Sequence, residues 1–336
     1  MDPRDALTAK GDVFDLQLQR FVAFESSFSS HVANVVRCSR YLAHMQKTRQ
    51  SFWAVHILLT VGSFAACLVS VQAQVTNELS VCSFNIRYAN PTDTLIWEDR
   101  KNEVADAVRY FDVMGLQEVL PIQWDDLRER LSFHDSYGIG READGHGEAC
   151  PIFWNRGRFD FLHGEVRWFS DTPDVPGSIS YDADLPRIVT VVVLYDRFSN
   201  RTLRFLNTHW SHVSEEARMS ASALLSGWSG WGGAADLTVV CGDFNAEPGA
   251  ESIENLMSTA NLQDTYDAAT FRCRRDFGTF PSFYPDRVGG APRIDYIFYR
   301  GEGTVDWICA DEYIKYGVYI SDHLPIHAIF KIPVNP

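Results

Sequence analysis

Carboxylate, amide and imidazole side chains recur in this sequence at the points where short apolar runs end. Eight of them stand out by type and position: Asn85, Glu118, His209, Asp243, Asn245, Asp295, Asp322 and His323. Hard divalent cations prefer oxygen ligands, and an imidazole beside a carboxylate can transfer protons. Strand ends in a layered sheet protein meet at one rim, where binding sites are commonly built. The pattern therefore predicts a metal-binding or acid–base site at such a rim.

Each of these residues also has an ordinary structural explanation when it is taken alone. An Asn that follows a strand, such as Asn85, is usually a turn former, and a Glu such as Glu118 commonly starts a helix. Asp243 and Asn245 could serve only a tight turn, and His209 could be a structural histidine. The ordered set as a whole is what indicates a site.

Apolar runs and amphipathic stretches alternate from residue 79 onward. The runs predict strands at 79–84, 112–117, 149–155, 187–195, 203–209, 237–243, 293–299 and 325–332. Apolar residues at helical spacing predict helices at 97–110, 122–131 and 214–227. Several strands are apolar on both faces, as buried strands are, and helices lie between them. This order predicts one layered α/β domain over 74–336, in which helices cover sheet.

The composition is that of an acidic, folded protein. In 336 residues, 30 Lys and Arg against 44 Asp and Glu give a net charge of −14, and 9 Trp, 13 Tyr and 22 Phe exclude an intrinsically disordered chain. The acidic balance, without a Lys/Arg run, excludes a protein that coats nucleic acid. Residues 74–336 hold 23 Lys and Arg against 39 Asp and Glu, a net charge of −16.

An uncharged, largely apolar segment centred on 52–71 precedes the domain. With basic residues before it and small residues after it, this segment predicts a secretory signal peptide over 45–73. Residues 1–44 would then be an N-terminal extension or the result of a wrongly assigned start codon. We expect a secreted or periplasmic protein. The alternative is a signal anchor that holds the protein in the membrane, because 52–71 is long enough to cross it.

Five cysteines lie in 74–336: Cys82, Cys150, Cys241, Cys273 and Cys309. An odd number in an exported protein leaves at least one free thiol, and the sequence leaves the pairing open. Cys82 and Cys241 lie in apolar runs, where we expect small buried side chains.

Six motifs resemble, in order and rough spacing, those of the endonuclease/exonuclease/phosphatase superfamily of metal-dependent phosphohydrolases. They are SFNIR (83–87), GLQEV (115–119), NTH (207–209), GDFNAEP (242–248), RIDYI (293–297) and SDHLPI (321–326). The segments 97–104, 147–155 and 185–190 further resemble small, mostly secreted members. The resemblance implies an α/β four-layer sandwich, with two face-to-face mixed β-sheets flanked by helices.

The resemblance also implies a metal site. Hydrolysis of a phosphoester requires that phosphate charge be neutralised, that water become a nucleophile and that the leaving oxygen be stabilised. We expect Mg²⁺, with Mn²⁺ as an alternative, and Glu118 as its main ligand. Asn85 and Asp322 would be further ligands or partners of the ligands. Asp243 would hold the attacking water, and Asn245 would donate to a phosphoryl oxygen.

Two histidines complete the implied catalytic set. His323 needs a carboxylate on its other ring nitrogen, and the resemblance supplies Asp295. His209 resembles the family histidine that contacts phosphate, and Glu148 stands where some nucleases have the carboxylate partner of that histidine. Arg187, at a strand start, is a candidate phosphate contact, although a surface charge is the simpler explanation.

Five other residues flank the motifs. His212 and Arg218 could line the pocket, but a solvated helix start explains them equally well. Trp97, Trp154 and Trp210 are expected in the core rather than as stacking platforms for a substrate.

The sequence favours a secreted phosphodiesterase. A secreted endonuclease is the alternative enzyme, and a non-catalytic binding or toxin-like module is the alternative from another class. The arginine-rich run of inositol-phosphate 5-phosphatases is missing, and Arg87 stands where abasic-site endonucleases carry a carboxylate. The acidic charge disfavours nucleic acid as the substrate. We expect a monomer, and a membrane partner only if 52–71 stays uncleaved.

Overall fold

The computed structural model describes residues 75–230, 232–273 and 278–335. The predicted extension (1–44) and the predicted signal peptide or anchor (45–73) lie outside these residues and stay predictions. Within the described part, no helix combines the length and the apolar character needed to cross a membrane.

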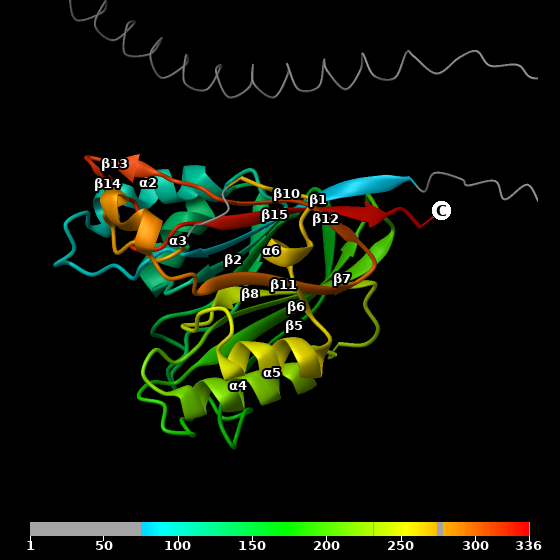
Figure 1. Cartoon of the computed structure of the whole chain (residues 1–336), viewed down its shortest axis with the longest axis horizontal. Coiled ribbons are helices and arrows are strands. Elements are labelled where there is room, and N and C mark those ends of the chain that lie inside the picture. The colour runs from blue at the N-terminus through cyan, green and yellow to red at the C-terminus, as the bar shows by residue number, and fades with distance from the viewer. Residues whose placement is uncertain (1–74, 231, 274–277, 336) are drawn as a thin grey trace, which may run out of the picture. The chain divides into compact units, whose positions relative to one another are not determined.

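Two large mixed sheets form the centre of the domain (Figure 1). The first has seven strands in the order β10-β12-β15-β1-β2-β4-β3. Its strands are β1 (Thr76–Asn85), β2 (Val113–Gln117), β3 (His134–Tyr137), β4 (Ile152–Asn155), β10 (Phe271–Arg272), β12 (Thr304–Ala310) and β15 (Ile326–Pro333). Strand β1 is parallel to β2 and antiparallel to β15.

The second sheet repeats this plan, with a central parallel pair and antiparallel neighbours. It has six strands in the order β5-β6-β7-β8-β11-β9, and β7 is parallel to β8. Its strands are β5 (Phe159–Trp168), β6 (Ile188–Asp196), β7 (Arg201–His209), β8 (Leu237–Asp243), β9 (Gln263–Asp264) and β11 (Asp295–Gly301). A separate two-stranded ribbon consists of β13 (Ile314–Lys315) and β14 (Val318–Tyr319).

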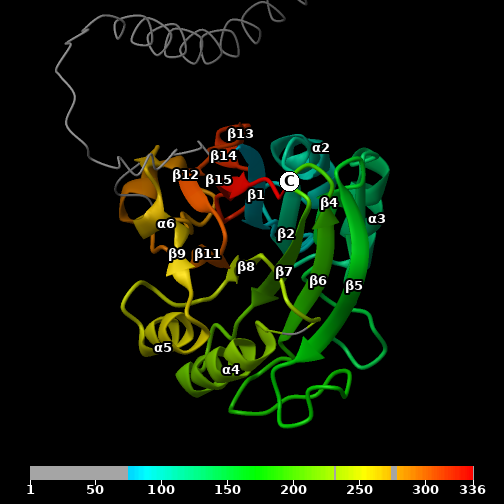
Figure 2. The same cartoon turned by 90° about the vertical axis from the view of Figure 1, so that its right-hand side faces the viewer.

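Helices cover the outer face of each sheet, and Figure 2 shows the layers from the side. The helices are α2 (Trp97–Val108), α3 (Pro121–Arg130), α4 (Glu215–Trp228), α5 (Glu251–Ala260), the short α6 (Thr265–Ala268) and the 3₁₀ helix η1 (Pro285–Gly290). Helices α2 and α3 pack on the first sheet, and α4 and α5 on the second. Helix α4 begins after Ser214, whose Oγ accepts a hydrogen bond from the Ala217 amide (3.1 Å). The predicted four-layer α/β sandwich is thus confirmed.

The main core lies between the two sheets, where buried side chains of both pack together. Gly115 on β2 allows the sheets to approach closely, because a Cβ there would lie 2.5 Å from the Cys241 sulfur and 2.8 Å from the Asn207 side chain. The Asn207 amide in turn donates to the backbone oxygens of Leu116 (2.8 Å) and Pro151 (2.9 Å), which links the sheets through a buried polar group.

All the predicted strands and helices are present, with ends that shift by a few residues. The strand expected at 149–155 starts only at Ile152, because Pro151 has no amide hydrogen to donate. The sequence pattern does not predict β5, β12 and α5, nor the short elements β3, β9, β10, β13, β14, α6 and η1. Strand β5 lies at the edge of its sheet and is partly exposed, so it lacks the continuous apolar run that identifies buried strands. Trp97, Trp154 and Trp210 are buried, as expected.

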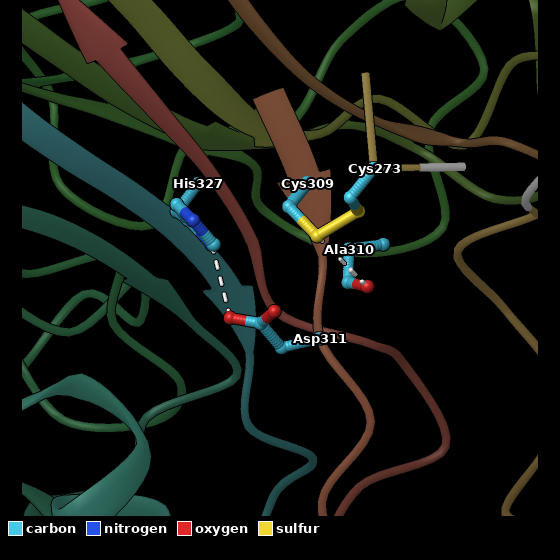
Figure 3. The surroundings of a disulfide bond; sticks show 5 residues. All are labelled: Cys273, Cys309, Ala310, Asp311 and His327. Carbon is cyan, nitrogen blue, oxygen red and sulfur yellow. Dashed lines mark hydrogen bonds and ion pairs between the residues drawn. A yellow bond between two sulfur atoms is a disulfide. The ribbon is translucent and has the colours of Figure 1, made fainter. Parts of the chain in front are cut away.

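One disulfide, Cys273–Cys309, joins the chain after β10 to β12 (Figure 3). Figure 3 also shows His327 of β15 beside this bond, with its Nδ1 atom 3.0 Å from the Asp311 carboxylate. The three other cysteines of the described chain, Cys82, Cys150 and Cys241, are free and buried. This agrees with the expectation of at least one free thiol.

Candidate active site

Polar residues of several strands meet at one end of the two sheets. Asn85 is the last residue of β1, and Asp243 is the last of β8. His209 ends β7 and pairs with Asp243 in the parallel ladder, whereas Asp295 opens β11 and pairs with Asp243 in the antiparallel ladder. The strand topology therefore places these four side chains at one rim.

Three non-glycine residues at this rim have the left-handed backbone conformation that most side chains avoid. They are Arg87 (φ 59°), Glu118 (φ 60°) and Asn245 (φ 48°). Local hydrogen bonds hold two of them: the Arg87 amide donates to Asn85 Oδ1 and the Asn245 amide to Asp243 Oδ1, both at 3.0 Å. Strained backbone of this kind clusters at functional sites.

His323 lies between two buried carboxylates. Its Nδ1 atom is 2.9 Å from Asp295 Oδ2, and its Nε2 atom is 3.5 Å from Asp243 Oδ2. Burial lowers the pKa of His323, but the charges of Asp295 and Asp243 outweigh burial and raise that pKa to about 10. Burial and the nearby Asp295 raise the pKa of Asp243 to about 7, against the opposing effect of His323. At neutral pH the imidazole is a charged donor beside a carboxylate that protonates readily.

Asn85 connects this group to Glu118. Its side-chain amide donates to Glu118 Oε1 and to Asp243 Oδ2, both at 3.0 Å. The other oxygen of Glu118 accepts the Tyr88 amide at 2.9 Å. Asp322 lies nearby, with its Oδ2 atom 3.6 Å from the guanidinium of Arg87. The structure thus brings together the three residues predicted at the metal site: Asn85, Glu118 and Asp322.

His209 and Asn245 also lie beside Asp243. The Nε2 atom of His209 is 3.4 Å from Asp243 Oδ2. Burial lowers the pKa of His209, and the charges of Arg187 and His323 lower it further, so this imidazole is neutral at pH 7. The side-chain Nδ2 atom of Asn245 donates to the Trp210 carbonyl (3.1 Å). This hydrogen bond orients the Asn245 side chain, which lines the cleft.

The partner of Glu148 in the structure is Arg141, whereas the family resemblance suggests Glu148 as the carboxylate partner of His209. Both carboxylate oxygens of Glu148 accept from the guanidinium of Arg141, at 2.9 and 3.1 Å. The planar guanidinium matches a carboxylate at two points, whereas an imidazole offers one, which favours the Arg141 pair. Glu148 still lines the cleft.

Arg187 is a buried wall of the cleft rather than a surface charge. Its Nη2 atom lies 3.0 Å from His212 Nδ1, so His212 accepts there and lines the cleft as well. Arg218 instead binds Glu215 (2.7 Å) and the Ser211 carbonyl (2.8 Å). Of the two uncertain candidates, the structure places His212 at the site, and Arg218 takes part in the start of α4.

The cleft itself has a volume of about 380 Å³. Its wall also contains residues with no role predicted from the sequence: Arg87, Tyr88, Arg141, Leu185, Phe280 and Ile294. Phe280 lies against the catalytic candidate His323, with ring centroids 4.7 Å apart. Arg141 and Phe280 lie in loops outside the motifs, and no signal in a single sequence connects them to the rim. Arg87 and Ile294, in contrast, lie within the motifs at 83–87 and 293–297.

Arg100 is a second kind of residue that sequence reasoning missed. This fully buried residue of α2 donates to the backbone oxygens of Ile86, Arg87 (2.6 Å), Tyr88 (3.2 Å) and Ile320 (3.3 Å). It therefore holds the loop after β1 and the loop before Asp322 without reaching the cleft.

Two neighbouring groups of donors, linked by the hydrogen bonds of Asn85, could hold a divalent cation. Ligand atoms of Asp243, Asp295 and His323 all lie within 4.8 Å of one another. The other group is Glu118 with Asn85 and Asp322. Burial and the charge of Glu118 raise the pKa of Asp322, against the effect of His323. A divalent cation would offset this crowding of carboxylates, and oxygen donors suit Mg²⁺ or Mn²⁺, so the residues present fit such an ion.

Comparisons with known proteins identify the family of this chain. The Endonuclease/Exonuclease/phosphatase family matches residues 82–323. An uncharacterized protein of Acanthamoeba polyphaga mimivirus is 29% identical over 258 residues, which is 70% of this chain and 92% of the viral protein.

Two solved structures from Bacteroides thetaiotaomicron are similar over most of the domain. One is an endonuclease/exonuclease/phosphatase family protein that is 30% identical, with a TM-score of 0.72 over 77% of this chain and 99% of the other. The second is a mannosyl-6-phosphatase, also 30% identical, with a TM-score of 0.70 over 75% of this chain and 99% of the other. Members of this superfamily are metal-dependent phosphoester hydrolases. The chain belongs to the endonuclease/exonuclease/phosphatase family.

Proposed function

We propose that this protein is a secreted, Mg²⁺-dependent hydrolase of small phosphoesters. The observation that carries the proposal is one connected set of side chains at the rim, in which Asn85 links Glu118 to Asp243 and Asp243 faces the His323–Asp295 pair. Such a set combines oxygen donors for a cation with an acid–base pair in the same cleft.

Each residue has a role in the proposed reaction. Glu118 would hold the cation with Asn85 and Asp322, and the bound cation supplies positive charge to the phosphoryl group. Asp243 would accept the proton of the attacking water. The charged His323, oriented by Asp295, would donate to a phosphoryl oxygen as negative charge develops there.

The charge of the domain supports a small substrate. Residues 74–336 have a net charge of −16 and only three lysines, Lys101, Lys315 and Lys331. A protein that tracks long nucleic acid needs several Lys or Arg contacts to phosphates. A phosphodiester is the substrate class that the sequence favours. A phosphomonoester is the second candidate, because the similar Bacteroides protein is a mannosyl-6-phosphatase.

Export is supported by chemistry as well as by the N-terminal pattern. The Cys273–Cys309 disulfide is typical of proteins outside the reducing cytosol. A secreted or periplasmic protein with its signal peptide removed remains the proposal, with membrane anchoring through 52–71 as the alternative. N-terminal sequencing of the protein from its native host tests this, and a mature protein that retains residues 1–44 would contradict it.

The substitution Glu118→Gln tests the proposed function. It keeps the shape of the side chain and removes the charge that would hold the cation, so phosphoester hydrolysis should fall by about 10²-fold or more with the fold intact. EDTA should abolish wild-type activity, and Mg²⁺ should raise the melting temperature of the wild type more than that of the variant.

A matched control is Glu129→Gln, which removes an equal charge from the exposed surface of α3. It should leave activity and the effect of Mg²⁺ unchanged. Full activity of Glu118→Gln, or wild-type activity that withstands EDTA, would reject the assignment. No hydrolysis of any phosphoester by the wild type with Mg²⁺ or Mn²⁺ would instead favour the non-catalytic alternative.

A further inference from the structure

The cleft shares part of its lining with a narrow end. This end is a cavity of about 10 Å³, close to the least volume that holds one water molecule. Five residues line both the cavity and the main cleft: Glu118, Arg141, Glu148, Arg187 and His209. The narrow end therefore has room for a single oxygen atom from a group bound in the cleft, but its volume is too small for a carbon substituent on that atom.

Arg187 supplies unused hydrogen-bond donors at this end. It is 6% exposed, and its Nη2 atom is the one that approaches His212. Its Nε and Nη1 atoms are buried and have no hydrogen-bond partner in the described structure. A buried guanidinium with two open donors is costly unless an anion binds it.

The neighbouring guanidinium does not share this property. Arg141 is paired at two points with Glu148, so its charge is offset by a carboxylate. Arg187 is thus the cation of the narrow end whose charge no such pair offsets. Its fork of N–H groups matches the oxygens of an unsubstituted phosphoryl group.

We propose that the substrate is a phosphomonoester, and that Arg187 is the residue that selects it over a phosphodiester. This inference rests on the proposed function, because it concerns the same cleft. A phosphomonoester has three unesterified oxygens and a charge near −2 at neutral pH, so one oxygen can enter the narrow end while others face Asn245 and His323. A phosphodiester in the same position would force its second organic group toward a cavity of one-atom size.

The reaction is hydrolysis with phosphorus–oxygen cleavage. The oxygen of water forms a bond to phosphorus, and the bond from phosphorus to the leaving oxygen breaks. One water proton passes to Asp243, the leaving oxygen takes a proton from solvent, and Asp243 later releases its proton to solvent, so the products are an alcohol and inorganic phosphate. No oxidant or reductant takes part.

Two substrates with the same leaving group test the selection: p-nitrophenyl phosphate and methyl p-nitrophenyl phosphate. The wild type with Mg²⁺ should have at least a ~10-fold higher kcat/KM for the monoester. Arg187→Gln should lower kcat/KM for the monoester by about 10²-fold, which corresponds to the loss of charge-assisted hydrogen bonds, and for the diester by less than about threefold. Arg187→Lys, which keeps the charge but not the fork, should be intermediate.

Binding of inorganic phosphate gives a second readout. Calorimetry should show phosphate binding to the wild type that weakens by about 10-fold or more in Arg187→Gln. The matched control Arg218→Gln removes a guanidinium whose partners are Glu215 and Ser211, and it should bind phosphate as the wild type does. Melting curves for each variant establish that it is folded. If Arg187→Gln does not fold, the same measurements on Arg187→Lys and the wild type test whether Arg187 selects the monoester.

The outcomes separate this inference from the proposed function. Metal-dependent hydrolysis of the diester at an equal or higher kcat/KM would overturn the inference and leave the proposed function in place. An equal loss for both substrates in Arg187→Gln and Arg187→Lys would also overturn the selective role. Absence of hydrolysis of either substrate would contradict the proposed function itself.

Discussion

Each end of the second sheet buries an aspartate, and the two aspartates differ in their hydrogen bonds and in the direction in which their pKa is shifted. Asp196 ends β6 and Asp243 ends β8, and both side chains are almost fully buried. Because β6 is antiparallel to β7 and β7 is parallel to β8, the two residues lie at opposite ends of the sheet. The comparison shows how a carboxylate that stabilises the fold differs from one that is available for chemistry.

Asp196 is neutralised and fully hydrogen-bonded. Its Oδ1 atom accepts from Arg158 Nε (2.8 Å) and the Phe198 amide (3.1 Å), and its Oδ2 atom from Arg158 Nη2 (2.8 Å) and Ser199 Oγ (2.6 Å). Burial raises its pKa, but the hydrogen bonds from Arg158 and Ser199 outweigh burial, and the pKa is lowered overall. Such a group is satisfied and has little capacity for a further ligand.

Asp243 is crowded by like charge instead. Asp295 faces it across the ladder, Glu118 is linked to it through Asn85, and burial raises its pKa to about 7. One oxygen of Asp295, Oδ1, is buried without a hydrogen-bond partner. Groups whose environment opposes their charge in this way are typical of catalytic and metal sites.

The largest expected effect is on activity at the crowded end. The substitution His323→Ala removes the charged donor beside Asp243, so phosphoester hydrolysis should fall by about 10³-fold, within the range for loss of a general acid or base. Steady-state kinetics with Mg²⁺ measures this. A fall below tenfold would show that His323 does not take part in the reaction.

The next largest effect is on the free energy of unfolding when Asp196 is substituted. Removing the carboxylate with Asp196→Ala leaves Arg158 buried with only Asp112 as an ion-pair partner, at 3.0 Å. Breaking a buried pair costs about 3–5 kcal/mol, and we expect a loss near 3 kcal/mol because Asp112 remains. Urea unfolding measures it, and activity per folded molecule should stay at the wild-type level. Unchanged stability would contradict the structural role.

The smallest effect is on how the free energy of unfolding depends on pH, which should differ between variants of Asp196 and Asp243. Urea unfolding in EDTA measures it. Because the folded pKa of Asp196 is below its ordinary value near 3.9, its stabilisation is complete above about pH 4 and is lost as pH falls through the folded pKa. The deficit of Asp196→Asn should therefore be constant above that pH and shrink only below it.

Asp243 should show the opposite dependence. Its folded pKa of about 7 lies above the unfolded value, so the folded wild type holds the proton more tightly and loses stability as pH rises from about 4 to 7. Relative to the wild type, Asp243→Asn should gain stability over this interval. If the unfolding free energies of Asp243→Asn and the wild type ran parallel from pH 4 to 7, the raised pKa of Asp243 would be contradicted.

How much of this could be predicted from the sequence depends on the kind of signal. Buried strands such as β6 and β8 read as apolar runs, and the residues that end them, such as Asp243, follow from strand position and motif order. The edge strand β5 and the Glu148–Arg141 pair could not be predicted, because exposure weakens the pattern and pairing depends on loop geometry. Arg100 likewise reads as an ordinary helix charge.

The most direct test of the central claim is the melting temperature of Asp243→Asn in EDTA at pH 8, measured beside its activity with Mg²⁺. If the folded protein destabilises the charged form of Asp243 and uses this residue in catalysis, the variant should melt at or above the wild-type temperature and lose about 10²-fold or more in activity. A melting temperature lowered as far as that of Asp196→Asn, with activity per folded molecule retained, would show that Asp243 stabilises the fold and takes no part in catalysis.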